Sequence, residues 1–556
     1  MGDSLEDPFF HRRETRDVIY ALASTQKLCI YAGAGITINR SGLSWRGMVD
    51  AILAPNVPDA RLRRVFIDTF GYLQSASTAS QLFADSVESG LGSDYSRDRM
   101  VDTLRYQIYS RGGWLDGRLA QSIALLAYSS LGKDPKRSIC LATPNYDDYL
   151  LQILDRVRSE EPFNGTLIAS KRPTILYPTS GDPLSAGKES VLADWVDDVN
   201  ASIFTPGALN LVHLHGRIVA NVAAGTEGVD IGRYPVVSEG DYTSTAPWTE
   251  KVLEQLLGHA DALLVGTSLT DLPLINALRR TNTGQHARYA LVCMQGSPQL
   301  KDREYRRLAT KRFDQLGVKP IYHDYYIQSA QFLQEVCTCV LLDEPAEYSR
   351  HSAGIRYGSR LTRWWQNWDQ RNRFDIEEHQ MDCHELLRAG VQAIRRKLGA
   401  PSSEALKVEV WLRWKPGEKR VLKLWASSTG TWPDFQSMRE GHIATDDEYL
   451  SVLAFRNGHP TRVDAKTSPD SKMITGRWRS FLSLPIWDED PGGSIPVGVI
   501  TLASSREGPE GSLSSDASQT RLSDCLDYLR VLGRGVTSPH VNALDEAFGA
   551  FTGKPS

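Results

Sequence analysis

The chemistry that this chain can perform is indicated first by a glycine-rich turn. Gly33, Ala34, Gly35 and Thr37 follow directly after the apolar run 27–32. A strand-to-helix turn with two glycines lets backbone N–H groups approach a pyrophosphate, and the start of the following helix favours negative charge. The segment therefore predicts a phosphate-binding turn, the alternative being an ordinary glycine turn.

A second polar segment, residues 143–147 (TPNYD), follows the apolar run 138–143. The carboxamide of Asn145 and the carboxylate of Asp147 can hold a ribose and orient an attacking water. Both residue types also cap helices, and a helix is predicted over residues 149–157. A binding role and a capping role therefore both stay open.

A third segment, residues 211–216 (LVHLHG), ends an apolar run with two histidines. A neutral imidazole, with an ordinary pKa of about 6.5, can take up a proton at cellular pH. His215 is therefore a candidate general base. His213 is expected on the same face and receives no role.

A fourth segment, residues 266–271 (GTSLTD), follows the apolar run 262–265. Its hydroxyl and amide groups can reach phosphate or ribose oxygens. By itself the segment is a weak signal, and its value lies in its position after a strand.

All four segments depend on the elements that place them. Strands are predicted by the apolar runs at 27–32, 138–143, 209–213, 262–266, 288–294 and 319–323, with helices over 12–26 and much of 45–135. This alternation predicts an α/β fold with a doubly wound, mostly parallel sheet in residues 1–344. Since the carboxyl ends of parallel strands form the binding edge of such a sheet, the four segments should meet there.

In this order, the segments resemble those of the SIR2-like (sirtuin-type) NAD-binding domain over roughly residues 15–330. The TPNYD segment is similar to the sirtuin Thr-Gln-Asn-Ile-Asp, and closer to the Thr-x-Asn-Tyr-Asp form of bacterial SIR2-like proteins. The resemblance implies a Rossmann-like fold with NAD+ as substrate. It further implies that Asn145 positions water and the ribose, that His215 is the base, and that Asp147 assists binding.

The same resemblance implies which residues bind NAD+. They are Gly33, Ala34, Gly35, Thr37, Trp45, Thr143, Gly266, Thr267 and Ser268. Trp45 belongs to a segment (GLSWR) that is one residue shorter than the sirtuin Gly-Ile-Pro-Asp-Phe-Arg loop and lacks its acid. We expect Trp45 to cover the nicotinamide side of the pocket.

The cysteines separate this chain from the deacetylase sirtuins. No Cys-x-x-Cys pair occurs among the seven cysteines, so we expect no structural zinc and no other metal. Without the zinc module, a protein-deacylating activity has less support. Zinc-less SIR2-like domains fused to a second domain resemble bacterial antiviral effectors that hydrolyse NAD+.

The remainder of the chain predicts a second domain. Residues 345–375 are rich in Arg and Trp and predict a partly helical connector, in which Trp364 and Trp368 can share a face and pack on a neighbouring domain. Helices over 377–398 and 522–532 and strands over 407–414, 420–427, 481–486 and 497–503 predict an α+β domain spanning 376–540. The last two strands resemble the end of a GAF domain, which implies a sensor of a small molecule.

Composition narrows the setting. A net charge of -4 gives no reason to expect nucleic acid as the main partner. The first 17 residues predict no signal peptide, and no apolar run approaches the roughly 20 residues that cross a bilayer. We therefore expect a cytoplasmic protein without a membrane partner, with reduced thiols.

The sequence-based hypothesis is an NAD+ glycohydrolase acting as an NAD-depleting effector in anti-phage defence, an abortive-infection system. The second domain would gate it in response to a small nucleotide or phage factor, and we expect a homo-oligomer. One alternative is a sensor that binds NAD+ or ADP-ribose without turnover. Another is an NAD-dependent protein deacylase or ADP-ribosyltransferase.

Overall fold

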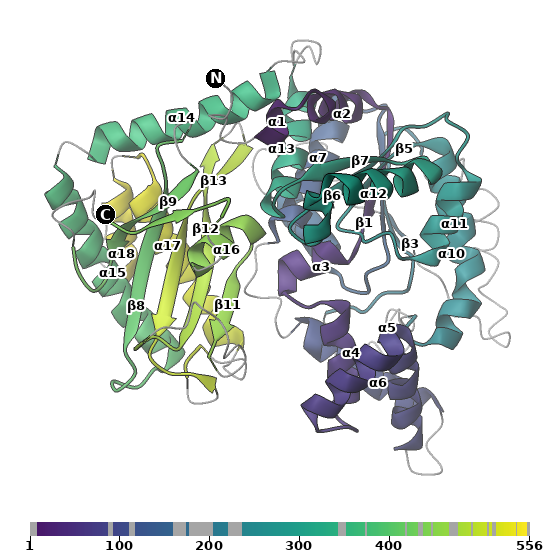
Figure 1. Cartoon of the computed structure of the whole chain (residues 1–556), viewed down its shortest axis with the longest axis horizontal. Helices are drawn as coiled ribbons and strands as arrows, with labels where there is room; N and C mark the ends of the chain where they lie inside the picture. The colour runs from purple at the N-terminus through teal and green to yellow at the C-terminus, as the bar shows by residue number, and fades with distance from the viewer. Residues whose placement is uncertain are drawn as a thin grey trace.

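In the part of the chain that the computed structural model describes, the strands form two β-sheets, which lie in separate halves of the molecule (Figure 1). The structure describes residues 8–86, 93–109, 117–159, 174–176, 204–220, 236–342, 352–372, 375–416, 420–431, 438–445, 449–465, 476–490, 493–508, 511–513, 519–540 and 542–552. Within these ranges, no helix is long and apolar enough to cross a membrane.

The first sheet is parallel throughout and has the order β3-β4-β2-β1-β5-β6-β7. Its strands are β1 (Lys27–Ala32), β2 (Ser138–Thr143), β3 (Thr174–Leu176), β4 (Leu209–His213), β5 (Asp261–Val265), β6 (Arg288–Cys293) and β7 (Lys319–His323). From β1 the chain builds outward on one side through β2 to β4, and then returns to the other side of β1 with β5. The carboxyl ends of β1 and β5 therefore flank the point where the strand order reverses, which is where open α/β sheets bind ligands.

Successive residues of the central strand face opposite layers, as the period of two in a strand requires. Leu28, Ile30 and Ala32 enter one apolar core, whereas Cys29 and Tyr31 enter another. The first core packs against α2 (Arg13–Ser24), α7 (Arg118–Lys133), α8 (Tyr149–Ser159) and α13 (Ile327–Leu341). The second packs against α10 (Glu239–His259) and α11 (Leu272–Arg280), with α12 (Arg303–Gln315) beside it. The sheet is thus covered on both faces.

Between α3 (Ala34–Ser41) and α7 the chain forms a helical module below the sheet in Figure 1. Its helices are α4 (Trp45–Leu53), α5 (Ala60–Asp85) and α6 (Ser93–Tyr109). The module has its own core, which also includes Tyr146 and Ile218 from the loops at the sheet edge and Tyr149 from the start of α8. The module therefore rests on the segments that carry the candidate site.

The second domain is built on an antiparallel sheet with the order β10-β9-β8-β13-β12-β11. Its elements are α15 (Ile376–Leu398), β8 (Leu406–Trp414), β9 (Val421–Ser427), β10 (Glu440–His442), α16 (Leu450–Asn457), β11 (Thr461–Asp464), β12 (Ser480–Asp490), β13 (Gly493–Ser504), α17 (Gln519–Thr537) and α18 (Ala543–Thr552). Helices α15 and α17 pack on one face with a core that contains Val408 and Val410, and α16 packs on the other with Trp411. This is an α+β arrangement, as predicted.

The segment predicted as a connector forms one long helix, α14 (Ser352–Asn372), which crosses from the second domain towards α1 (Pro8–His11) in Figure 1. Trp364 and Trp368 share a face of α14, and both are buried. Their indole N–H groups donate to the carbonyls of Thr537 and Val536 at 3.0 Å. These tryptophans therefore pack α14 against the second domain.

The strands of the first sheet agree with the predicted runs, apart from β3 and shifts of one residue at the ends of β5 and β6. In the second domain β10, β11, α16 and α18 were not predicted. The first three have only three, four and eight residues, too few for a clear periodic pattern. Their structure depends on neighbouring strands and on the core around Trp411.

Candidate functional site

The glycine turn after β1 is packed against the turn after β5. Gly33 N donates to the Val265 carbonyl and Gly35 N to the Gly266 carbonyl, both at 2.8 Å. A Cβ added to Gly33 would lie 2.6 Å from the Gly266 oxygen, and one added to Gly35 would lie 2.7 Å from Gly266 Cα. Gly266 itself has φ +65°. The glycines thus allow two backbones to meet at the reversal of strand order, while Ala34 in the first turn of α3 stays exposed.

Asn145 lies at the end of β2 and is joined to this turn. Its side-chain Nδ2 donates to the carbonyl of Gly33 at 3.0 Å, and its backbone N–H donates to the hydroxyl of Thr143 at 3.1 Å. Thr143 is buried and donates in turn to the carbonyl of Ala32 at 2.7 Å. Thr143 therefore holds the ends of β1 and β2 together, and the carboxamide of Asn145 is oriented beside α3.

Asp147 turns away from the sheet edge. Its carboxylate accepts hydrogen bonds from the hydroxyl of Thr37 and, at 3.1 Å, from the backbone N–H of Tyr149. Burial raises the pKa of Asp147 from 3.8 to about 6. Asp147 therefore has the capping role in part, since its carboxylate accepts from the first N–H of α8. The hydroxyl of Thr37 donates to the same carboxylate.

The two histidines of the third segment have different surroundings. His213 is fully buried, and its Nδ1 lies 3.2 Å from the carbonyl oxygen of Asn145. Burial lowers the pKa of His213 to about 4, so its imidazole is neutral at cellular pH. His213 therefore supports the loop of Asn145 from below.

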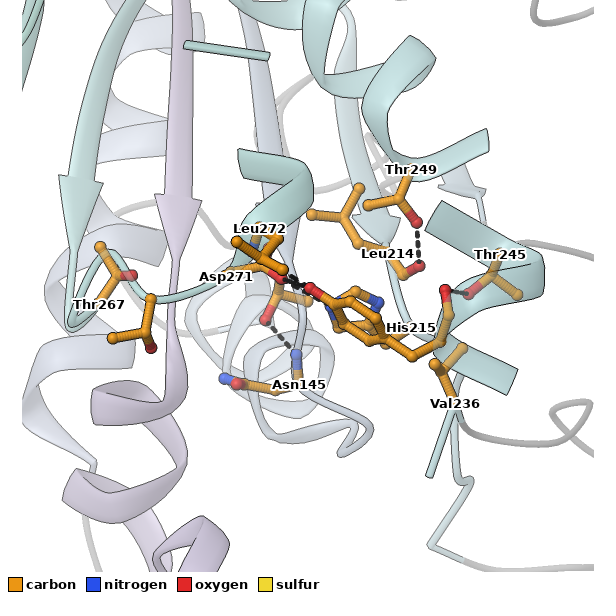
Figure 2. Close-up of polar contacts among 12 residues, drawn as sticks. Asn145, Leu214, His215, Val236, Thr245, Thr249, Thr267, Asp271 and Leu272 are labelled. Atoms are coloured by element: carbon orange, nitrogen blue, oxygen red, sulfur yellow. Dashed lines mark hydrogen bonds and ion pairs between the residues drawn. The ribbon is translucent and has the colours of Figure 1, made fainter. Parts of the chain in front are cut away.

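The side chain of His215 faces Asp271, the residue just before α11, whereas that of His213 faces the backbone of Asn145. Its Nε2 lies 3.5 Å from the Oδ1 atom of Asp271, and its ring lies 5.5 Å from the ring of Tyr242. The Nδ1 atom of His215 is buried and has no hydrogen-bond partner among the residues that the structure describes. Figure 2 shows His215 and Asp271 close together, with Asn145 below them and Thr267 to one side.

The turn after β5 is strained at one residue. Leu269 has φ +51°, a conformation that is costly for a leucine. The hydroxyl of Thr267 accepts from the N–H of Leu269 at 3.2 Å, and Ser268 and Thr270 join their hydroxyls at 2.8 Å. Ser268 is exposed and Thr267 is half-buried, so both are available at the edge of the sheet.

Trp45 begins α4 in the helical module. Its ring lies 5.8 Å from that of Tyr146, the residue after Asn145, and it is half-buried. Ser44 caps this helix by accepting from the N–H of Gly47 at 3.2 Å. Trp45 is therefore fixed beside the loop of Asn145.

A groove of about 890 Å³ lies between α5 and the first turns of α10. Its lining is mostly small and polar and consists of Ser77, Ser80, Gln81, Ala84, Ser238, Glu239, Gly240, Asp241, Thr243 and Ser244. None of the predicted site residues lines this groove. The predicted residues Asn145 and His215 lie instead in the polar cluster at the strand ends.

Three residues of this cluster were given no role by the sequence: Asp271, Tyr242 and Tyr31. Asp271 was visible as the last residue of the GTSLTD segment, but only the fold brings it to His215. Tyr242 lies in α10 and Tyr31 in β1, and neither position carries a motif.

The possible metal ligands of the chain, including its cysteines, do not gather into a cluster where the structure describes them. Among the described residues, no group of three or more His, Cys, Asp or Glu side chains is placed to hold a metal ion. Cys337 contacts the Ser129 hydroxyl at 3.2 Å, whereas Cys339 is buried in the apolar core. These two thiols therefore serve packing on different sides of α13.

Comparison with known proteins gives no family. No protein-family model matches the chain, and a search of curated proteins finds no match. The fold and the cluster define an α/β protein with a second α+β domain and a candidate ligand site where the order of the parallel strands reverses.

Proposed function

We propose that this protein is an NAD+ glycohydrolase of the SIR2-like kind. The observation that carries the proposal is the convergence of Asn145, His215 and the first turn of α3 at the reversal of strand order. A helix N-terminus favours an anion such as a pyrophosphate, and a carboxamide and an imidazole beside it suit a ribose. The same order of segments supports a Rossmann-like SIR2 domain.

The reaction cleaves the bond between nicotinamide nitrogen and ribose C1′. Water adds its oxygen to C1′, nicotinamide leaves with the bonding electron pair, and one proton is released, so that NAD+ and water give ADP-ribose, nicotinamide and H+. Positive charge develops on the ribose in the transition state. A water held on one face and a leaving group held on the other are the geometry that the reaction needs.

Each residue of the cluster has a role in this proposal. The carboxamide of Asn145, fixed by its bond to Gly33, orients the water and a ribose hydroxyl. His215 accepts a proton, since its Nδ1 is buried without a partner and gains one when a hydroxyl binds. Trp45 covers the nicotinamide side from above Tyr146.

The phosphates would rest against the exposed backbone of Ala34 and the hydroxyls of Thr267 and Ser268, because the N–H groups of Gly33 and Gly35 already donate to the carbonyls of Val265 and Gly266. Asp147 acts at one remove, because its carboxylate fastens Thr37 and hence the first turn of α3. Thr37 was expected to bind NAD+ directly, but its hydroxyl donates to Asp147, so we assign it a supporting role.

The second domain is proposed to be a GAF-like regulator, because it contacts the helices behind the site. The Trp487 ring lies 5.2 Å from the guanidinium carbon of Arg118, and the Gln334 side chain accepts from the Ser494 N–H at 2.8 Å. Leu119, which follows Arg118 in α7, donates its N–H to the Asn39 side chain of α3 at 3.0 Å. These contacts link the β12–β13 hairpin through α7 to the last turn of α3, the helix that begins at the glycine turn.

Uncontrolled loss of NAD+ is lethal, so a regulated hydrolase suits an effector of anti-phage defence that acts by abortive infection. A phage factor or small nucleotide would be its activator. We further propose that the active form is a homo-oligomer, and that ADP-ribose passes to water.

The test is to incubate the purified chain with NAD+, with and without extract of phage-infected cells, and to follow nicotinamide and ADP-ribose. Equal release of both supports hydrolysis. Binding of NAD+ without release of nicotinamide favours a sensor, and ADP-ribose found on protein favours a transferase. Release of neither product under any condition contradicts the proposal.

A further inference from the structure

Asp271 occupies the N-cap position of α11 but does not cap this helix. An aspartate at this position ordinarily accepts from a backbone N–H in the first turn and contributes about 1 kcal/mol. Here the side chain makes no such bond, and the first N–H of the helix, that of Leu272, donates to the Tyr242 hydroxyl at 3.2 Å. The carboxylate is therefore released for other contacts.

Those contacts come from three other elements. The hydroxyl of Tyr242 donates to Oδ1 of Asp271 at 2.6 Å, and that of Tyr31 donates to Oδ2 at 3.1 Å. His215 Nε2 approaches Oδ1 at 3.5 Å. Residues of β1, the β4 edge, α10 and α11 thus meet at one carboxylate.

The protonation states of this group are consistent with one another. Burial and the nearby carboxylate raise the pKa of both tyrosines, so their hydroxyls stay protonated and donate. Burial alone would raise the pKa of Asp271, but hydrogen bonds from His215, Tyr242 and Tyr31 lower it overall. The carboxylate is therefore ionised and can only accept.

We propose that Asp271, held by Tyr31 and Tyr242, is the positioning residue that fixes the tautomer of His215. An ionised carboxylate facing Nε2 requires that this nitrogen carry the proton of the neutral imidazole. The lone pair then lies on Nδ1, the buried nitrogen that has no partner. Nδ1 is thus the basic atom, and a substrate hydroxyl or water donates its proton there once ligand binding uncovers this buried nitrogen. This inference rests on the proposed hydrolase for its catalytic meaning.

The test compares Asp271→Asn with Asp302→Asn in the full chain. Asp302 is the N-cap of α12 and accepts from the Tyr305 N–H at 2.8 Å, so it gives the same chemical change at a true cap away from the site. Imidazole 15N spectra, with His215 assigned from a His215→Gln variant, report the tautomer without any turnover. Nicotinamide release gives kcat and KM.

We expect wild type and Asp302→Asn to hold the proton of His215 on Nε2. Asp271→Asn should lose this preference, and its kcat should fall by roughly 10²-fold with little change in KM, the size of a lost general base. Tyr242→Phe should give a smaller change in the same direction, and it tests the same contact if Asp271→Asn does not fold.

An unchanged tautomer in both Asp271→Asn and Tyr242→Phe overturns the inference and leaves the hydrolase proposal intact. A changed tautomer with an unchanged kcat also overturns the positioning role. A wild-type protein that releases no nicotinamide under any condition contradicts the hydrolase, while the 15N spectra still decide whether Asp271 fixes the imidazole.

Discussion

The hydroxyl of Thr37 donates to the buried carboxylate of Asp147, across 110 positions of sequence. This bond fastens the first turn of α3 to the loop that carries Asn145, and Asp147 also accepts from the N–H of Tyr149 in α8. Three elements at the edge of the sheet therefore depend on one carboxylate, although neither Thr37 nor Asp147 needs to contact a ligand.

Thr37→Val should destabilise the protein, because it leaves a buried oxygen of Asp147 without its donor. The cost is on the order of 1–3 kcal/mol, and thermal melting measures it. Thr37→Ser retains the hydroxyl and should restore most of the loss. Equal melting of the valine and serine variants would show that the bond contributes nothing.

Stability should fall as the pH rises through the titration of Asp147. The native carboxyl keeps its proton up to a pKa of about 6, whereas the unfolded chain loses it near 3.8. Since the native state binds more protons between these values, stability decreases from about pH 4 to about pH 6 and then levels off. The melting temperature of wild type minus that of Asp147→Asn should follow this curve. A difference that rises with pH contradicts the assigned environment.

Asn145→Ala should lower nicotinamide release by roughly 10² or more while the fold survives, as for other groups that position a reacting atom. Asn276→Ala is the matched control. Asn276 lies on α11, away from Gly33, and its side-chain amide donates to Glu250 of α10 at 2.7 Å. Activity and melting are measured on both. Near-normal turnover in a folded Asn145→Ala protein removes this carboxamide from the mechanism.

The two histidines should separate stability from activity. His213→Ala removes a fully buried ring and should cost roughly 2–4 kcal/mol, as other cavity-forming substitutions do. His215→Ala removes the proposed base and should lower turnover by roughly 10²–10⁴ with a smaller loss of stability. Melting and nicotinamide release on both variants test this. The reverse pattern would make His213 the functional residue.

The strands of the first sheet could be predicted because each is a short, continuous apolar run, as strands buried on both faces require. The positions of Asn145 and His215 followed, since both end such runs. The contact between His215 and Asp271 could not be predicted, because it joins two loops whose proximity depends on the strand order. Tyr242 could not be predicted either, since it lies in the first turn of α10, where no motif marks it. The packing of Gly35 on Gly266 could not be predicted either. The glycines suggested a ligand, whereas in the structure each lacks the side chain that would clash with the backbone of the other.

The packing of the connector helix α14 could not be predicted from its sequence. Arg- and Trp-rich composition indicated a connector, yet the apolar cluster around Trp368 is continuous with the core that contains Phe9 and Phe332 of the first domain. Cutting the chain near residue 344 would therefore expose apolar surface on both sides. Point substitutions at the contact between domains are the better test of regulation.

Trp487→Ala in the full chain should raise nicotinamide release in the absence of any activator by about 10-fold or more. The Trp487 ring contacts Arg118, and the neighbouring N–H of Leu119 donates to Asn39 in the last turn of α3. Loss of the ring should therefore loosen the restraint on α3, the helix that begins at the glycine turn. A ligand that swings a two-state equilibrium from 1:99 to 99:1 supplies about 5.5 kcal/mol, and removing one contact supplies only part of this. The variant should therefore remain further activated by infected-cell extract. Trp478→Ala is the control, because its ring contacts Lys407 and Arg477 within the second domain. If wild type and Trp487→Ala hydrolyse NAD+ at the same full rate, and extract adds nothing to either, the second domain does not gate the first.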